Sequence, residues 1–227
     1  MIESARIRGI VFDLDGTLYV NEPFVAEIQN AAVGYIAILK GISTSDAAQL
    51  MATTRQQLCK KLGTDQTLSA VCTELGGTVQ QLHRHFQETL QPEAFLERDD
   101  RVLGLLQRLA QRYSLYIYTN NNRLLTERIV SQLGLDGMFS RLFTIDDSWQ
   151  GKPDQQMLVR LLDQIALKPG EVLFVGDRYD VDLRLPEQLG CPVQLSQSVE
   201  QLLSLKQLLL RPSTCEHRSL FPAQIVY

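Results

Sequence analysis

The 227-residue chain lacks the features that mark secreted, membrane-spanning and nucleic-acid-binding proteins. Its four cysteines are scattered without paired spacing, which argues against a disulfide framework or a zinc site and indicates free thiols in a reducing compartment. No apolar run approaches the length of a membrane span, and the first residues do not form a secretory signal. A formal net charge of −4 offers no electrostatic footprint for a nucleic-acid polymer or an anionic membrane. We therefore expect a cytoplasmic monomer or homodimer without nucleic-acid or membrane partners.

The composition that remains is that of a globular protein, with 44% hydrophobic and 21% charged residues. The length suits one domain with a large insertion, or two small domains. Five short apolar runs predict buried strands, because they lack the polar alternation of a half-exposed sheet; they cover residues 7–12, 114–119, 141–145, 171–176 and 191–196. Helical patterns lie between them and after them, at residues 97–112, 123–133, 153–165 and 198–210. This alternation predicts an α/β fold with an open parallel sheet and helices on both faces.

One stretch breaks the alternation, because residues from about 21 to about 95 show helix patterns and no convincing strand. Three or four helices are expected there, with the clearest patterns at residues 31–41, 43–63 and 78–90. Ser43 or Ser45 is a candidate N-cap of the second of these helices. The simplest interpretation is an all-helical module inserted after the first strand.

The first strand runs into "FDLDGT", which places Asp13 and Asp15 two residues apart. Alternate residues of an extended chain point to the same side, so the two carboxylates could face one site. Like charges this close repel each other and need a cation or a shared proton. The alternative is that "DGT" is only a turn, since Asp and Gly are ordinary turn residues.

Three further polar features fall at comparable places. Thr119 closes the second strand and precedes "NNN", Lys152 lies in "GKPD" directly before a helix, and Asp177 closes the fourth strand in "GDRYDVD". Each has an ordinary interpretation, as a strand residue, a solvated lysine or a turn. Together they meet at the carboxyl ends of parallel strands, where ligands bind in open α/β sheets. Their common placement therefore favours a functional site.

These residue types fit phosphoryl transfer. Asp13 could attack a phosphoryl group and form an aspartyl phosphate, while Mg²⁺ held by Asp13, Asp177 and backbone oxygen would neutralise the assembled negative charge. Lys152 would hold the nucleophile and phosphate oxygens, and the Thr119 hydroxyl and the backbone N–H at Asn120 could take further phosphate oxygens. Asp15 would protonate the leaving oxygen and later deprotonate the attacking water.

With these four motifs in this order, the sequence resembles the haloacid dehalogenase superfamily of phosphohydrolases. The resemblance implies a Rossmann-like core, Mg²⁺ dependence and a phosphoaspartyl intermediate. It implies Asp13 as nucleophile, Asp15 as acid/base, phosphate contacts from Thr119, Asn120 and Lys152, and a metal site drawn from Asp13, Asp15, Asp177 and Asp182. For the last acidic position, Asp182 fits the family spacing better than Asp180, although Pro186 follows where a small residue is more usual.

The helical insertion resembles the α-helical cap of this superfamily, which closes over the core and contacts substrate. The implied division is a core of residues 1–19 and 96–212, a cap of residues 20–95 and a tail of residues 213–227. "FDLDGTLY", "YTNNN" and "LDGMFSRLFTIDD" are similar to the pyrimidine nucleotidase-like branch, which suggests a nucleoside monophosphate, a sugar phosphate or a related small phosphomonoester. Candidate cap contacts, each also explained by packing or exposure, are Tyr19, Phe24, Tyr35, His83 and His85.

Three alternatives stay open. A dehalogenase of the superfamily needs neither Mg²⁺ nor an acid/base at the second aspartate, so Asp15 and the acidic "GDRYDVD" weigh against it. A phosphonatase needs a cap lysine, for which Lys40, Lys60 and Lys61 are available but are adequately explained as surface residues. A non-catalytic binding protein on the same fold is disfavoured because none of the motifs has been lost.

Overall fold

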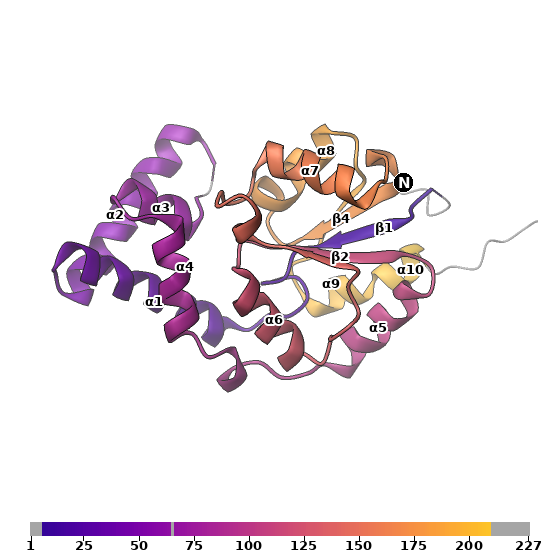
Figure 1. The fold of residues 1–227 in the computed structure, drawn as a ribbon, viewed down its shortest axis with the longest axis horizontal. Coiled ribbons are helices and arrows are strands. Elements are labelled where there is room, and N and C mark those ends of the chain that lie inside the picture. Colours follow the sequence, from indigo (N-terminus) through magenta and orange to yellow (C-terminus); the bar gives the residue numbers. More distant parts are fainter. Residues whose placement is uncertain (1–5, 65, 210–227) are drawn as a thin grey trace, which may run out of the picture.

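The computed structural model describes residues 6–64 and 66–209, so the predicted tail at 213–227 lies outside the described residues. In the described part, a five-stranded parallel sheet has the order β3-β2-β1-β4-β5 (Figure 1). Its strands are β1 (Gly9–Phe12), β2 (Ser114–Tyr118), β3 (Arg141–Phe143), β4 (Val172–Gly176) and β5 (Val193–Leu195). The predicted α/β fold with an open parallel sheet is therefore confirmed.

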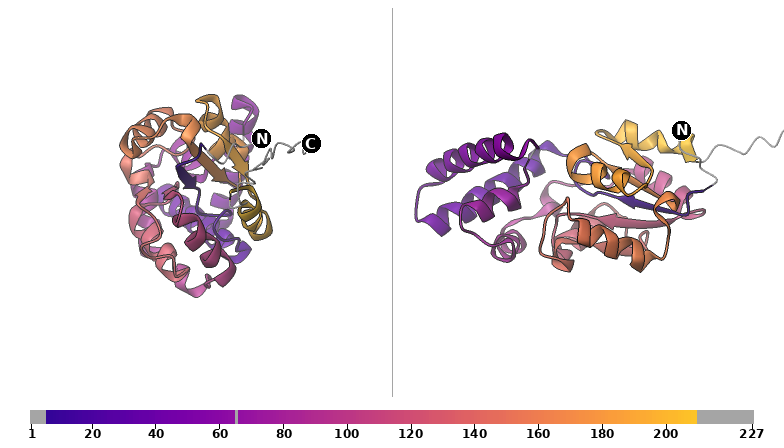
Figure 2. Two further views of the ribbon diagram at one scale, coloured as in Figure 1. Left: turned by 90° about the vertical axis from the view of Figure 1, so that its right-hand side faces the viewer. Right: turned by 90° about the horizontal axis from the view of Figure 1, so that it is seen from above.

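Helices cover both faces of this sheet, as the layered arrangement in Figure 2 shows. Successive residues of a buried strand point to opposite faces, so Ile10 and Phe12 join one apolar cluster whereas Val11 joins the other. The first cluster is completed by α5 (Asp100–Ala110), α6 (Arg123–Gln132), α9 (Val199–Leu203) and α10 (Leu205–Leu209). The second is completed by α7 (Gln155–Ile165) and residues around α8 (Arg184–Gln188).

Several elements differ in their limits from the sequence prediction. The third strand stops at Phe143 rather than at residue 145, because a 3₁₀ turn begins at Thr144. The Thr144 backbone N–H donates to the Asp147 carboxylate at 2.7 Å. The fifth strand begins only after Pro192, which has no N–H for a ladder hydrogen bond. The single predicted helix at 198–210 is divided at Ser204, whose hydroxyl donates to a backbone carbonyl of the preceding turn.

Between β1 and α5, the described residues form a helical module of α1 (Glu22–Lys40), α2 (Thr44–Leu62), α3 (Leu68–Glu74) and α4 (Val79–Thr89). Helix α1 begins nine residues before the predicted 31–41, because the Asn21 side chain caps it and Pro23 suits a first turn. Ser43, one of the two predicted caps, accepts a hydrogen bond from the Asp46 N–H at the start of α2.

The helical module lies beyond the carboxyl ends of the strands (Figure 1). Its buried residues Phe24, Ile36 and Leu82 belong to the same apolar cluster as Ile10 and Phe12 of the sheet, so the two parts share a core. The two connections to the sheet also lie together, since the Asn21 amide donates to the Phe95 carbonyl at 2.8 Å. The module is thereby fixed over the edge of the sheet where the polar motifs end.

Cys72 and Cys191 are buried free thiols, and Cys215 lies outside the described residues. Within the described part of the chain, no helix combines the length and apolar character needed to cross a bilayer.

Two adjacent leucines of α6 provide a test of this packing. Leu125 is fully buried, whereas Leu124 is 49% exposed. We expect Leu125→Ala to lower the free energy of unfolding by about 2–5 kcal/mol, because it leaves a cavity in the core beneath the sheet. Leu124→Ala should change it by less than about 0.5 kcal/mol. Urea unfolding of both variants measures the difference, and equal losses would contradict the placement of α6.

Candidate active site

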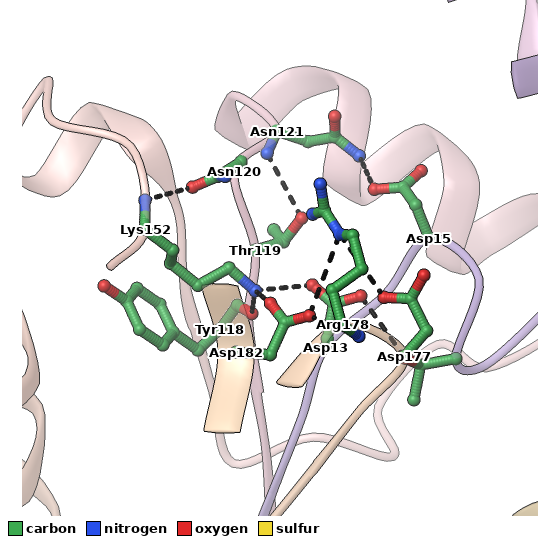
Figure 3. A network of polar contacts seen from close by, with 11 residues as sticks. Asp13, Asp15, Tyr118, Thr119, Asn120, Asn121, Lys152, Asp177, Arg178 and Asp182 are labelled. Carbon is green, nitrogen blue, oxygen red and sulfur yellow. Dashed lines mark hydrogen bonds and ion pairs between the residues drawn. The ribbon is translucent and has the colours of Figure 1, made fainter. Parts of the chain in front are cut away.

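Three of the predicted residues follow neighbouring strands of the sheet. Asp13 follows β1, Thr119 follows β2 and Asp177 follows β4, and β1 lies between the other two strands. The backbone hydrogen bonds of the sheet extend into the site. The Asp13 N–H donates to the Val175 carbonyl at 2.8 Å, and the Thr119 N–H donates to the Phe143 carbonyl at 3.0 Å. The strands thus bring these side chains to one edge of the sheet, as Figure 3 shows.

Lys152 lies at the centre of this group and is only 3% exposed. Its ammonium donates to the Asp13 carboxylate at 2.6 Å, to the Asp182 carboxylate at 2.5 Å and to the Tyr118 carbonyl at 3.0 Å (Figure 3). The side-chain oxygen of Asn120 accepts from the Lys152 backbone N–H at 2.7 Å and holds this loop against the end of β2. Lys152 is therefore a buried ion-pair partner, and the solvated-surface interpretation does not apply.

Asp13, Asp177 and Asp182 each offer one carboxylate oxygen, and these oxygens lie within 4.8 Å of one another. Two glycines make this approach possible. A Cβ on Gly16, whose φ is +80°, would lie 2.6 Å from an Asp177 carboxylate oxygen, and a Cβ on Gly176 would lie 2.5 Å from the Asp182 Cβ. The glycines of "DGT" and "VGD" are thus required by the closeness of the carboxylates.

A one-turn π-helix (Tyr179–Leu183) selects which acidic residue of "GDRYDVD" joins the site. The Arg178 N–H donates to the Asp182 carboxylate at 3.1 Å and turns that side chain toward Lys152. Asp180 instead forms an ion pair with Arg184 at 3.3 Å, away from the cluster. Such π turns are rare and occur frequently at functional sites.

Burial governs the electrostatics of the cluster. It raises the pKa of Asp13 to about 7, with Lys152 opposing the shift and the neighbouring carboxylates adding to it. Burial also raises the pKa of Asp177 to about 6. For Asp182, burial is outweighed by Lys152 and Arg178, and the pKa is lowered. For Lys152, burial is outweighed by Asp13 and Asp182, which raise its pKa.

The donor set fits Mg²⁺, a hard cation that takes oxygen ligands. Among the described residues, one buried carboxylate oxygen of Asp177 has no hydrogen-bond partner. The carboxylates of Asp13, Asp15, Asp177 and Asp182 are faced in this cluster by the cations of Lys152 and Arg178. Two negative charges would remain when all these groups are ionised, and a divalent cation would balance them.

Asp15 lies beside this cluster, but its carboxylate is not among the three closely spaced groups. One of its oxygens accepts a hydrogen bond from the Tyr19 hydroxyl. The other accepts from the Asn121 amide at 2.7 Å (Figure 3). Burial raises the pKa of Asp15, and the Tyr19 hydrogen bond opposes the shift. The Asp15 carboxylate thus lies at the site but outside that group of three, and its predicted role as a metal ligand stays a prediction.

Two cavities open at the site between the sheet and the helical module. One of about 250 Å³ is bounded by Asp15, Asn120 and Arg178 below and by His83 and Phe86 above. A larger one of about 770 Å³ extends along Lys152 toward α2 and α3.

The side of the site where phosphate is expected contains Thr119, which is buried and accepts a hydrogen bond from the Asn121 N–H at 3.1 Å. Asn122 caps α6 and is linked to the helical module, since it accepts from the Gln87 amide at 3.1 Å. Asn121 and Arg178 directly adjoin predicted motif residues, but neither has a function predicted from the sequence.

The candidate contacts from the helical segment occupy different places. Phe24 is buried in the core, and the Tyr35 hydroxyl contacts residues within the helical module. His85 packs against Tyr35, with the ring centroids 6.1 Å apart. Of the five candidates, Tyr19 contacts Asp15 and His83 lines the smaller cavity.

Comparisons with known proteins identify relatives of this chain. A sequence model described as haloacid dehalogenase-like hydrolase matches residues 7–190. A phosphoglycolate phosphatase of Pectobacterium atrosepticum is 27% identical, with 84% of this chain and 80% of that protein covered. The pyrophosphatase PpaX of Bacillus pumilus is 26% identical, with 78% of each chain covered. The crystal structure of a HAD phosphatase from Thermococcus onnurineus has a TM-score of 0.59 at 19% identity, covering 89% of this chain and 98% of that one, which shows a shared fold.

The ion-pair arrangement predicts a large effect of Lys152→Met on stability. Removing the ammonium takes a buried cation away from the carboxylates of Asp13 and Asp182, so we expect the free energy of unfolding to fall by about 3–5 kcal/mol. Urea unfolding in EDTA measures the effect, and Lys206→Met on the exposed face of α10 is the control. A loss as small as that of the control would contradict the buried position of Lys152.

The burial of His83 predicts that the stability of the protein depends on pH. Burial lowers its pKa from 6.5 to about 4, so the unfolded chain takes up the proton first and stability is lost as the pH falls from 6.5 toward 4. Between pH 7.5 and pH 5, the wild-type protein should lose about 2 kcal/mol more stability than His83→Gln. Urea unfolding at both pH values tests this, with His85→Gln on the same helix as the control. Equal pH dependence of the wild type and His83→Gln would contradict a neutral buried imidazole.

Proposed function

The chain belongs to the haloacid dehalogenase-like hydrolase family, and we propose that it is a Mg²⁺-dependent phosphatase that hydrolyses a small phosphomonoester through a phosphoaspartyl intermediate. The observation that carries the proposal is the buried Lys152 ammonium between Asp13 and Asp182, beside a buried Asp177 oxygen that accepts no hydrogen bond. This arrangement suits the binding of a dianionic group and a divalent cation at one sheet edge.

In the proposed reaction, a carboxylate oxygen of Asp13 attacks phosphorus while the bond from phosphorus to the leaving oxygen breaks. Thr119, the backbone at Asn120 and Lys152 hold the phosphoryl oxygens, and Asp15 gives the leaving oxygen its proton. Water then attacks the phosphorus of the phosphoaspartyl group while Asp15 takes a proton from that water. The bond from phosphorus to the Asp13 oxygen breaks, which releases inorganic phosphate and restores the carboxylate. Mg²⁺ bound by Asp13, Asp177 and Asp182 would supply neutralisation of the phosphoryl charge.

The size of the two cavities supports a small phosphorylated metabolite as substrate. Because the helical module forms one wall of both cavities, we propose that it is the cap of the enzyme. We propose the boundaries 1–19 and 96–212 for the core and 20–95 for the cap. The relatives named as phosphoglycolate phosphatase and pyrophosphatase support small anionic esters. A nucleoside monophosphate or sugar phosphate is the substrate class suggested by the motifs. We also propose that the protein is cytoplasmic and acts as a monomer or homodimer.

The alternative reactions have less support. A dehalogenase has no need of the hydrogen-bonded Asp15 or of the three carboxylates at one point. A phosphonatase needs a cap lysine at the substrate, whereas Lys40, Lys60 and Lys61 are exposed and line neither cavity.

The direct test is phosphate release from a panel of phosphomonoesters, including nucleotides and sugar phosphates, with Mg²⁺ or with EDTA. We expect release that depends on Mg²⁺ and favours one class of ester. Asp13→Asn should reduce turnover at least about 1,000-fold while leaving the fold intact, because the amide is nearly isosteric but is a poor nucleophile. The exposed Asp136→Asn is the control. Near wild-type turnover by Asp13→Asn would refute the mechanism, and no release from any ester would refute the phosphatase.

A further inference from the structure

The carboxylate of Asp15 is held at both ends by donors from different parts of the chain. The Tyr19 hydroxyl donates to one oxygen, and the Asn121 amide, 106 residues further along the chain, donates to the other at 2.7 Å. A carboxylate otherwise rotates broadly about its terminal torsion. These two hydrogen bonds, which we call the carboxylate clamp, restrict Asp15 to one orientation.

Tyr19 is well placed to hold Asp15 firmly, because it is itself fixed. Its side chain is buried. Its ring lies against that of Phe24 in α1, with centroids 6.3 Å apart, and Phe24 in turn lies 5.7 Å from the ring of Phe95. Phe95 belongs to the second connection between the sheet and the helical module. The clamp therefore rests on aromatic packing that joins both connections.

We propose that Tyr19 is a positioning residue for the phosphatase reaction, and that with Asn121 it fixes the carboxyl group of Asp15 for transfer of its proton to the leaving oxygen. The inference rests on the proposed function, in which Asp15 is the acid/base. In the step concerned, an Asp13 oxygen bonds to phosphorus, the bond from phosphorus to the leaving oxygen breaks, and the proton of Asp15 moves to that oxygen. Fixed geometry is what makes such a proton transfer efficient.

The clamp has a signature that a purely structural role lacks. A leaving alkoxide needs a proton as the bond breaks, whereas p-nitrophenolate is stable enough to leave without one. Loosening Asp15 should therefore impair hydrolysis of an alkyl phosphate far more than hydrolysis of an aryl phosphate. The ratio of kcat/KM for β-glycerol phosphate to that for p-nitrophenyl phosphate measures this, because kcat/KM covers the steps up to loss of the leaving group.

We expect Tyr19→Phe, which removes only the hydroxyl, to lower this ratio at least about tenfold, within the range that general acids contribute. Asn121→Ala, which removes the donor to the other oxygen, should lower the ratio in the same direction. This second variant tests the clamp independently if Tyr19→Phe does not fold. Tyr113→Phe is the matched control, because the Tyr113 hydroxyl donates to the Leu209 carbonyl, and it should leave the ratio unchanged.

Asp15→Asn separates failure of the clamp from failure of the proposed function. This variant should lower the ratio at least as much as the clamp variants do. If it does not, the acid/base assignment of Asp15 is wrong. If Asp15→Asn lowers the ratio but folded Tyr19→Phe leaves it unchanged, or depresses both esters equally, the positioning role of Tyr19 is overturned and the phosphatase mechanism stands.

Discussion

The ammonium group of Lys152 lies between the carboxylates of Asp13 and Asp182, and much of the site is organised around that placement. Removing these carboxylates from water and bringing them together is unfavourable, and a buried cation with short contacts offsets that free energy. The three groups come from the end of β1, the loop before α7 and the π turn after β4. One ion-pair group therefore fixes the relative positions of three segments far apart in the sequence.

Much of this arrangement could be predicted from the sequence. Apolar runs without polar alternation indicated a parallel sheet, and polar residues at the ends of those runs indicated a common edge. The resemblance to the haloacid dehalogenase superfamily is confirmed by the family match. The roles of Asp13, Thr119 and Lys152 stay predictions, although the structure places them together. The pyrimidine nucleotidase-like suggestion also stays a prediction, since small cavities and family membership are compatible with many esters.

Other features had no usable signal in the sequence. The contact of Asn121 with Asp15 joins residues 106 apart, and no local pattern reports which asparagine of "NNN" turns toward it. The burial of Lys152 depends on its partners, because an isolated lysine before a helix is ordinarily solvated. The family spacing favoured Asp182 over Asp180, but nothing in the sequence indicated the π turn that brings Asp182 to Lys152. The observed ends of several helices and strands differ from the predicted ends because of single capping or proline residues, such as Asn21 and Pro192.

The contact between Asn21 and Phe95 has a consequence for how such a protein can change over evolution. Because the chain leaves the sheet and returns to it at adjacent points, the inserted helices can be replaced by another segment whose ends are equally close, without altering the order of the strands. A replacement of this kind would keep the residues at the sheet edge and change the residues of the helical module that line the cavities. It would also have to supply an aromatic neighbour for Tyr19, so a replacement that preserves the strands can still disturb Asp15.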